Sequence, residues 1–115
     1  MHPAARSAEM MLEIIELIDM QMLDETREHF LATPMMQEIL AFRLLRVGEA
    51  SGRMPDEDKA RHPEIPWKAI TGLRNLIAHN YDDVEVGILH SIAVSNVPAL
   101  AAACHAILAH YGETF

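Results

Sequence analysis

Cysteine, aromatic side chains and strand-like alternation are all scarce in this chain. Of its 115 residues one is a cysteine, Cys104, and aromatic residues make up 5%. A lone thiol cannot form an internal disulfide, and Cys104 lies in an apolar run where it would pack as a small hydrophobic residue. We therefore expect a reduced, cytoplasmic protein.

No segment alternates apolar and polar residues for long enough to predict a β-strand. Half of the residues are hydrophobic, and the eight methionines and many alanines suit helix-on-helix packing. The length fits one domain, since domains commonly have about 100–150 residues. We predict an all-α fold for residues 1–115: one domain, built as an antiparallel bundle of three to four long helices with short connecting helices.

Sequence patterns of membrane and metal-binding proteins are also missing. We find no N-terminal signal-peptide pattern and no apolar run of about 18 residues of the kind that spans a membrane. The chain has no H-E-x-x-H motif, no cysteine pair and no two histidines three or four residues apart. We expect no membrane span, no metal site and no cofactor.

The charge balance is acidic but uneven. The net charge of −8 argues against a general RNA coat, because phosphate contacts need Lys and Arg. Between Arg43 and Arg74, however, lie seven of the nine basic residues and five acids, so this window carries +2. Such a region could hold a short RNA segment, or it could be an ordinary solvated surface of mixed charge.

Apolar spacing predicts two long helices in the first half of the chain. Over residues 5–23, five apolar residues recur at intervals of three and four (Met11, Ile14, Ile15, Ile18 and Met22). Residues 24–32 are polar and predict a short helical turn. A second long helix begins with Thr33 as N-cap and Pro34 in its first turn, and stops at Gly52. Its expected apolar face is Met35, Ile39, Phe42, Leu45 and Val47.

The second half predicts a connector and two further helices. Residues 53–66 contain three prolines and one short helix near 56–61. Trp67 opens a helix whose core face is Trp67, Ile70, Leu73 and Ile77, so we interpret Trp67 as core and not as a platform for stacking bases. This helix should fray between His79 and Tyr81. Asp82 or Asp83 should cap a last helix over 84–108, which Pro98 should kink or break near Asn96.

The residues best suited to chemistry are Arg74, Asn75, His79 and Tyr81. Cleaving RNA without a metal needs a base, an acid and a cation beside the reacting phosphate. Histidine titrates near neutrality, and arginine offers a charged fork of donors that matches phosphate.

Helix geometry constrains how these residues act together. Asn75 and His79 share a face, so the amide could orient the imidazole. Arg74 and His79 diverge by about 140° on one straight helix. Either the helix unwinds at His79, or two copies complete the site across a two-fold axis. We favour the second, because it also supplies a second histidine. As an alternative, His79 simply caps a helix end.

Four segments together resemble the HepT-like HEPN family of ribonucleases. In order they are Arg46-Val47-Gly48-Glu49-Ala50, Pro63-Glu64-Ile65-Pro66-Trp67, the stretch from Gly72 to Tyr81, and Val97-Pro98-Ala99-Leu100. The resemblance covers nearly the whole chain. It implies a homodimer with a metal-independent endoribonuclease site at the dimer cleft, where Arg74 and His79 are catalytic, Asn75 supports them, and RNA is the substrate.

The resemblance also implies a biological setting. HepT is the toxin of a two-gene, type VII-like toxin–antitoxin module, and its antitoxin MntA is a nucleotidyltransferase that attaches AMP to the motif tyrosine, here Tyr81.

Glu49 could reach the cleft and hold Arg74 or His79, or be merely structural. Two alternatives remain. One is a non-catalytic HEPN module that binds nucleotide or its nucleotidyltransferase partner, which the acidic net charge favours, and the other is an inert helical dimerisation domain.

Overall fold

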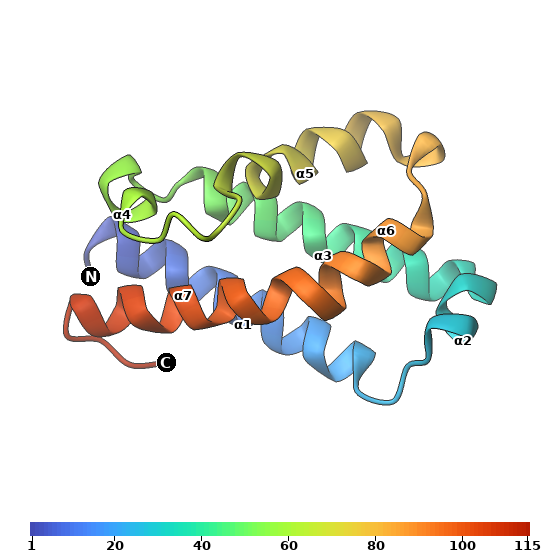
Figure 1. Cartoon of the computed structure of the whole chain (residues 1–115), viewed down its shortest axis with the longest axis horizontal. Coiled ribbons are helices and arrows are strands. Elements are labelled where there is room, and N and C mark those ends of the chain that lie inside the picture. Colours follow the sequence, from blue (N-terminus) through green and yellow to red (C-terminus); the bar gives the residue numbers. More distant parts are fainter.

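A computed structural model describes residues 1–115 and contains helices but no strand. The long helices are α1 (Pro3–Met22), α3 (Pro34–Gly52), α5 (Trp67–Asn80) and α7 (Val97–His110). Between them lie α2 (Arg27–Ala32), α4 (Asp56–Ala60), the 3₁₀ turn η1 (Tyr81–Asp83), α6 (Val86–Ser91) and the π-helical segment η2 (Ile92–Asn96). Successive long helices run in opposite directions, which confirms the predicted all-α bundle (Figure 1).

Helix α3 lies between α1 and α5, and α7 packs on α1. One connected core runs through these contacts, and the predicted face of α1 is its centre, with Met11, Ile14, Ile15 and Ile18 all buried. Polar contacts are few and specific. The Ser7 hydroxyl donates to the carbonyl of Ala50 at 2.6 Å, which ties α1 to α3 inside the core.

The apolar face predicted for α3 is wrong in its first half. Met35 and Phe42 are 68% and 61% exposed, and Ile39 is also at the surface. The helix instead buries an adjacent stripe against its neighbours: Gln37, Leu40, Ala41, Leu44, Val47, Gly48, Ala50 and Ser51. Both stripes have helical spacing, so periodicity alone could not tell which one the neighbouring helices cover.

Two predicted helix caps are also wrong in their chemistry. Thr33 does occupy the N-cap position of α3, but its hydroxyl donates backwards to the carbonyl of His29 at 2.7 Å. Asp82 and Asp83 lie in η1, and α6 begins after Glu85 without a side-chain cap. Short polar side chains can bond to either flanking turn, so sequence position does not fix their partner.

The connector between α3 and α5 is firmly tied to the bundle. The indole nitrogen of Trp67 donates to the carbonyls of Lys59 and His62, at 3.1 Å and 3.0 Å, while the ring is buried as predicted. Asp58 is fully buried, pairs with Arg61, and accepts from the Tyr111 hydroxyl at 2.6 Å. These bonds hold the start of α5 in place.

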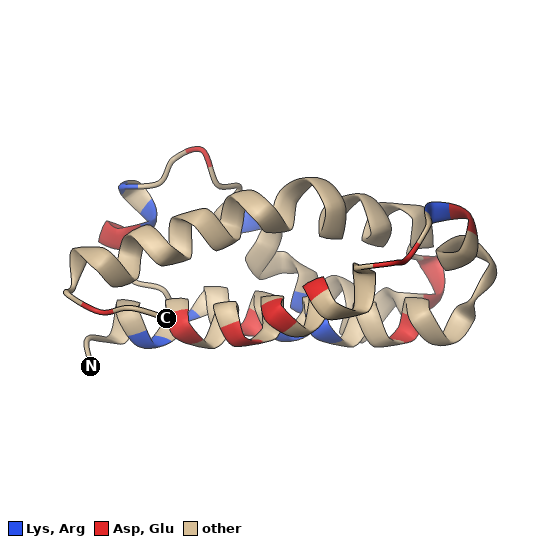
Figure 2. Cartoon of the chain, turned by 90° about the horizontal axis from the view of Figure 1, so that it is seen from below, with Lys and Arg blue, Asp and Glu red and all other residues tan.

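Residues from Val86 to His110 form one continuous helix without a charged residue (Figure 2). By length and composition it is apolar enough to cross a membrane, so the expectation that no such run exists is wrong. Within the bundle it is a core helix, with Leu100, Cys104 and Ile107 buried. The helix does not break near Asn96; the irregularity there is π-helical, since the Val97 amide bonds five residues back to Ile92, next to Pro98.

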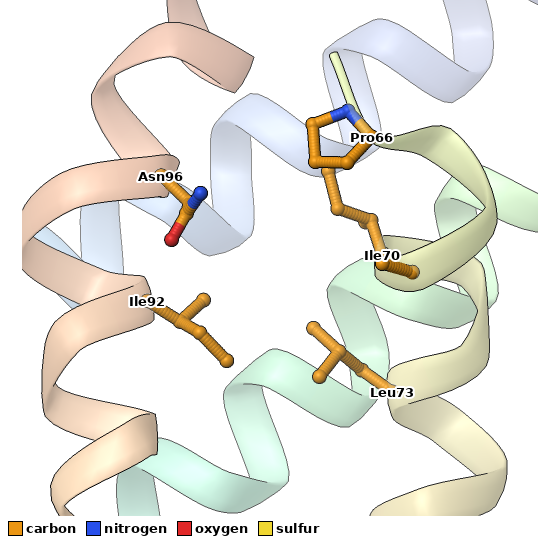
Figure 3. A pocket seen from close by; sticks show the side chains of 6 residues that line it. Pro66, Ile70, Leu73, Ile92 and Asn96 are labelled. Carbon is orange, nitrogen blue, oxygen red and sulfur yellow. The ribbon is translucent and has the colours of Figure 1, made fainter.

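Helix α5 packs chiefly on α3, and its flank toward the final helix is open. A pocket of about 140 Å³ lies there, lined by Pro66, Ala69, Ile70, Leu73, Ile92 and Asn96. Figure 3 shows the side chains of α5 facing those of η2 across this space. The helix that carries the candidate site therefore depends mainly on one neighbour.

Candidate functional site

Helix α5 stays regular through His79 and ends at Asn80, where η1 begins. It buries Trp67, Ile70, Leu73 and Ile77, and Arg74 and His79 lie at the surface. Since the helix does not unwind at His79, the two side chains leave it about 140° apart. One copy therefore does not bring these two side chains together on a single face.

Arg74 lies beside two polar neighbours. Its Nε is 3.7 Å from Oε2 of Glu49 on α3, and its Nη1 donates to Oδ1 of Asn75 at 3.2 Å. The Arg74 and Glu49 side chains are 51% and 42% exposed, so this ion pair is open to water. The possible contact between Glu49 and Arg74 is present in the structure.

A polar hollow surrounds this arginine. It has a volume of about 400 Å³ and no hydrophobic lining residue, and its walls are Gly48, Glu49, Gly52, Arg53, Thr71, Arg74 and Asn75. The hydroxyl of Thr71, one of these residues, is 3.0 Å from that of the buried Ser51, and the pair joins α3 to α5. A hollow of this kind suits a charged, hydrogen-bonding ligand better than an apolar one.

His79 is exposed, and its ring makes no side-chain hydrogen bond within the chain. The Asn75 amide, which we expected to orient the imidazole, accepts from Arg74 instead. The expected Asn75–His79 contact is therefore not seen. Both ring nitrogens of His79 remain available to a substrate or to another chain.

Tyr81 lies at the other end of the α3–α5 contact. Its ring is half-buried, and burial raises the pKa of its phenol above 10.0, with the charges of Glu38 and Asp82 adding to the shift. The hydroxyl therefore stays protonated at neutral pH. Arg74 is beside Glu49, and Tyr81 follows Arg74 by seven residues, or roughly 10 Å along a helix axis.

Helix α3 exposes the apolar stripe of Met35, Ile39 and Phe42. Phe42 lies one to two turns before Glu49 on the same helix, and Glu49 is beside Arg74. Monomer surfaces seldom leave large apolar side chains grouped in this way without a partner. The motif thus borders a surface suited to protein contact.

Among the members of the polar hollow that the sequence did not indicate as site residues, Arg53 is the charged one. It is exposed, directly follows Gly52 at the end of α3, and lines the same hollow as Arg74. Its spacing of seven residues from Arg46 could have indicated that both share the outer stripe of α3. The structure also groups no three His, Cys, Asp or Glu side chains as ligands for a metal ion.

Sequence comparison identifies relatives of this chain. The family described as "Ribonuclease HepT-like" matches residues 11–107. The chain is 34% identical over 88 residues to "Probable ribonuclease HepT" of Thermococcus cleftensis, which covers 76% of this chain and 80% of that protein. It is 30% identical over 73 residues to a "Putative RNase" of Caldanaerobacter subterraneus subsp. tengcongensis, covering 64% and 65% of the two chains.

A further relative is larger. The chain is 29% identical over 89 residues to a "Gamma-glutamylcyclotransferase and putative RNase" of Methanocaldococcus jannaschii, which covers 77% of this chain but 40% of that protein. No solved structure matches the chain. The family match and the relative from Thermococcus cleftensis lead to one conclusion: the chain belongs to the HepT-like family of HEPN ribonucleases.

Proposed function

We propose that this chain is a metal-independent endoribonuclease that acts as a homodimer in the cytoplasm. The observation that carries the proposal is the polar hollow of α3 and α5, in a chain of the HepT-like family. In it Arg74 touches Glu49 and Asn75, and His79 lies unengaged on the last turn of the same helix.

The reaction follows from the chemistry of these groups. The imidazole of one His79 takes the proton from an RNA 2′-hydroxyl, whose oxygen attacks the adjacent phosphorus. The bond to the 5′-oxygen breaks, and a second imidazole gives that oxygen a proton. Arg74 stabilises the negative charge that builds on the phosphate oxygens. The products are a 2′,3′-cyclic phosphate and a 5′-hydroxyl.

A second copy of the chain supplies the pairing of Arg74 with His79 that one copy lacks. Arg74 and His79 diverge on a straight helix, so an isologous dimer brings the arginine of one protomer toward the histidine of the other. The exposed stripe of Met35, Ile39 and Phe42 lies on α3 next to the motif and is apolar enough to form the contact. The two-fold symmetry also places the His79 imidazoles of both protomers at the site.

We further propose that the chain is the toxin of a HepT/MntA-type module. A nucleotidyltransferase antitoxin of the MntA kind attaches AMP to Tyr81. The added phosphate then lies next to the motif and repels the RNA backbone. Tyr81 is a regulatory acceptor in this scheme, and Arg74 and His79 carry the chemistry.

The decisive experiment compares the purified wild-type chain with His79→Ala and Arg74→Ala on RNA in the presence of EDTA. Wild type should cleave and leave cyclic phosphate ends, and both variants should lose cleavage while keeping the helical circular-dichroism spectrum. His110→Ala removes another exposed histidine and serves as control. Equal cleavage by wild type and His79→Ala would refute the catalytic role.

A second function competes because the chain carries a net charge of −8. In that case the chain is a non-catalytic module that binds nucleotide or the nucleotidyltransferase. A wild-type protein that binds this partner, leaves RNA intact and does not arrest growth when expressed alone would favour the binding module.

A further inference from the structure

The seven arginines of the chain divide into two groups by their contacts. Three are hydrogen-bonded to other helices or the connector and serve the fold. Arg27 donates to the Gly87 carbonyl at 3.3 Å, and Arg43 donates to the Leu17 carbonyl at 3.0 Å. Arg61 is paired with the buried Asp58. These three guanidinium groups are committed to structural contacts.

The other four arginines, Arg6, Arg46, Arg53 and Arg74, are exposed and donate to no backbone carbonyl and to no buried carboxylate. Arg74 has the open contact with Glu49 at 3.7 Å. Arg53 touches the sulfur of Met10 at 3.6 Å, and a thioether is a weak acceptor that does not neutralise charge. The fold therefore leaves a small set of cations available to a ligand within an acidic protein.

Arg53 connects two hollows on the surface. One is the polar hollow around Arg74. The other has a volume of about 330 Å³ and lies against the first turns of α1, lined by Met1, Pro3, Arg6, Ser7, Met10 and Arg53. Arg74, Arg53 and Arg6 thus follow one another across α5, α3 and α1. We call these three residues the arginine track.

Few acids oppose the track. Glu49 is the one acidic residue among those that line the two hollows, and it is already beside Arg74. The surface of α1 turns acidic from Glu9 onward, one turn after Arg6, with Glu13, Glu16 and Asp19 beyond it, so α1 favours anions only in its first turn (Figure 2). The track has a defined end at Arg6.

We infer that Arg53 and Arg6 bind the phosphodiester backbone of the RNA strand next to the phosphate that Arg74 holds. The inference rests on the proposed ribonuclease function and extends it to residues outside the motif. Guanidinium groups bind phosphate oxygens through paired donors, and each such contact releases condensed counterions. The track would direct a single strand from the cleft across α3 toward the start of α1.

The test measures RNA binding without cleavage. A fluorescein-labelled single-stranded RNA is titrated by fluorescence anisotropy, at several salt concentrations, against the His79→Ala protein and against the same protein carrying Arg6→Gln and Arg53→Gln. We expect the two substitutions to raise Kd on the order of tenfold at low salt. They should also flatten the slope of log Kd against log salt by about 1.4, or about 0.7 for each phosphate that is no longer neutralised.

Two control proteins separate local binding from net charge. Ala102→Glu with Ala106→Glu lowers the net charge equally on the exposed face of α7 and should leave Kd within about twofold. Arg6→Lys with Arg53→Lys keeps both charges and should keep most of the salt slope. Far-ultraviolet circular dichroism checks the fold of each variant.

The outcomes are distinguishable. If the His79→Ala protein binds RNA and the two glutamine substitutions change neither Kd nor slope, the arginine track is wrong and the motif proposal stands. If the α7 control weakens binding as much as the glutamine pair, general charge and not the track governs affinity, and the inference falls. If wild type neither binds nor cuts RNA, the proposed function and the inference fail together.

Discussion

Gly48 of α3 approaches the backbone of Arg74 so closely that no side chain fits between them. A Cβ on residue 48 would lie 3.0 Å from the Arg74 nitrogen and 2.8 Å from the Ile70 carbonyl oxygen. Both atoms belong to backbone that α5 cannot move locally. The position of Arg74 over the polar hollow therefore depends on the absence of a side chain at residue 48.

Gly48→Ala should push α5 away from α3. We expect a loss of about 1–3 kcal/mol in the free energy of unfolding, measured by urea denaturation, because overpacking strains both helices. RNA cleavage should fall as well. Gly72→Ala is the matched control, since a Cβ at this helical position meets nothing within 4 Å. It should stabilise the chain by about 0.5–1 kcal/mol. Equal stability of the two variants would contradict the close-packing argument.

Phe42→Glu should separate the proposed dimer. The side chain is 61% exposed, so the fold tolerates the charge, but an apolar interface would not. We expect a monomer in sedimentation experiments and a loss of RNA cleavage. Leu23→Glu changes a side chain that is 79% exposed at the end of α1 and should leave the assembly unchanged. A Phe42→Glu dimer with full activity would exclude this face as the interface.

Glu49→Gln should tighten RNA binding by a few fold. The carboxylate lies beside Arg74 and repels phosphate, so its removal frees the guanidinium. Stability should change by less than about 1 kcal/mol, because both groups are exposed to water. Kd is measured in the His79→Ala background. Weaker binding by Glu49→Gln would instead show that the carboxylate positions Arg74 productively.

Tyr81→Phe should leave RNA cleavage largely intact and abolish the addition of AMP by an MntA-like nucleotidyltransferase. The phenol is the acceptor and the raised pKa keeps it protonated, so the transferase must supply the base. Mass spectrometry detects the adduct. Tyr111→Phe removes the other tyrosine and should still accept AMP. An inactive Tyr81→Phe protein, tested without any partner, would place Tyr81 in the chemistry.

His90 should make the fold sensitive to mild acid. Its ring is buried, and Nδ1 accepts from Arg27 at 3.3 Å. Burial first, and the Arg27 charge second, lower its pKa below 6.5, and nearby Glu25 opposes the shift. The unfolded chain thus binds a proton more readily than the folded one. The stabilising contribution is complete above about pH 6.5 and declines as pH falls toward the lowered pKa.

Urea denaturation at about pH 7.5 and about pH 5.5 checks this dependence. Wild type should lose more stability between the two conditions than His90→Gln, which cannot titrate. Carboxylate groups contribute equally to both proteins, so the difference isolates His90. The same pH dependence in both proteins would contradict the argument.

The sequence predicted the helices well because local signals agree with the fold. Pro34 and Trp67 lie in the first turns of α3 and α5, as expected, and the irregularity expected beside Pro98 is the π-helical segment η2. Periodic apolar residues then place the core face of α1. Helix starts and apolar periodicity depend on residues that are close together in the chain, so a single sequence is enough to predict them.

Relations between helices were not predictable in the same way. Ile39 and Phe42 have core-like spacing but face solvent, because α1 and α5 approach α3 from other directions. Asp58 stands in a charged run typical of a surface, yet Tyr111, 53 residues later, covers it. The Asn75 side chain can reach either Arg74 or His79 on the same helix. Which of them it bonds depends on side-chain conformation, and the sequence does not record this.

The open flank of α5 has a consequence for how the molecule loses activity. Native proteins open in cooperative units, and units with fewer buried contacts open at lower free energy. With α3 as its principal neighbour, α5 should show faster native-state hydrogen exchange than α1 and α3, which share the central core. Undocking of this one helix removes Arg74 and His79 together. Gentle warming should therefore switch the nuclease off reversibly, at temperatures where the remaining helices are still packed.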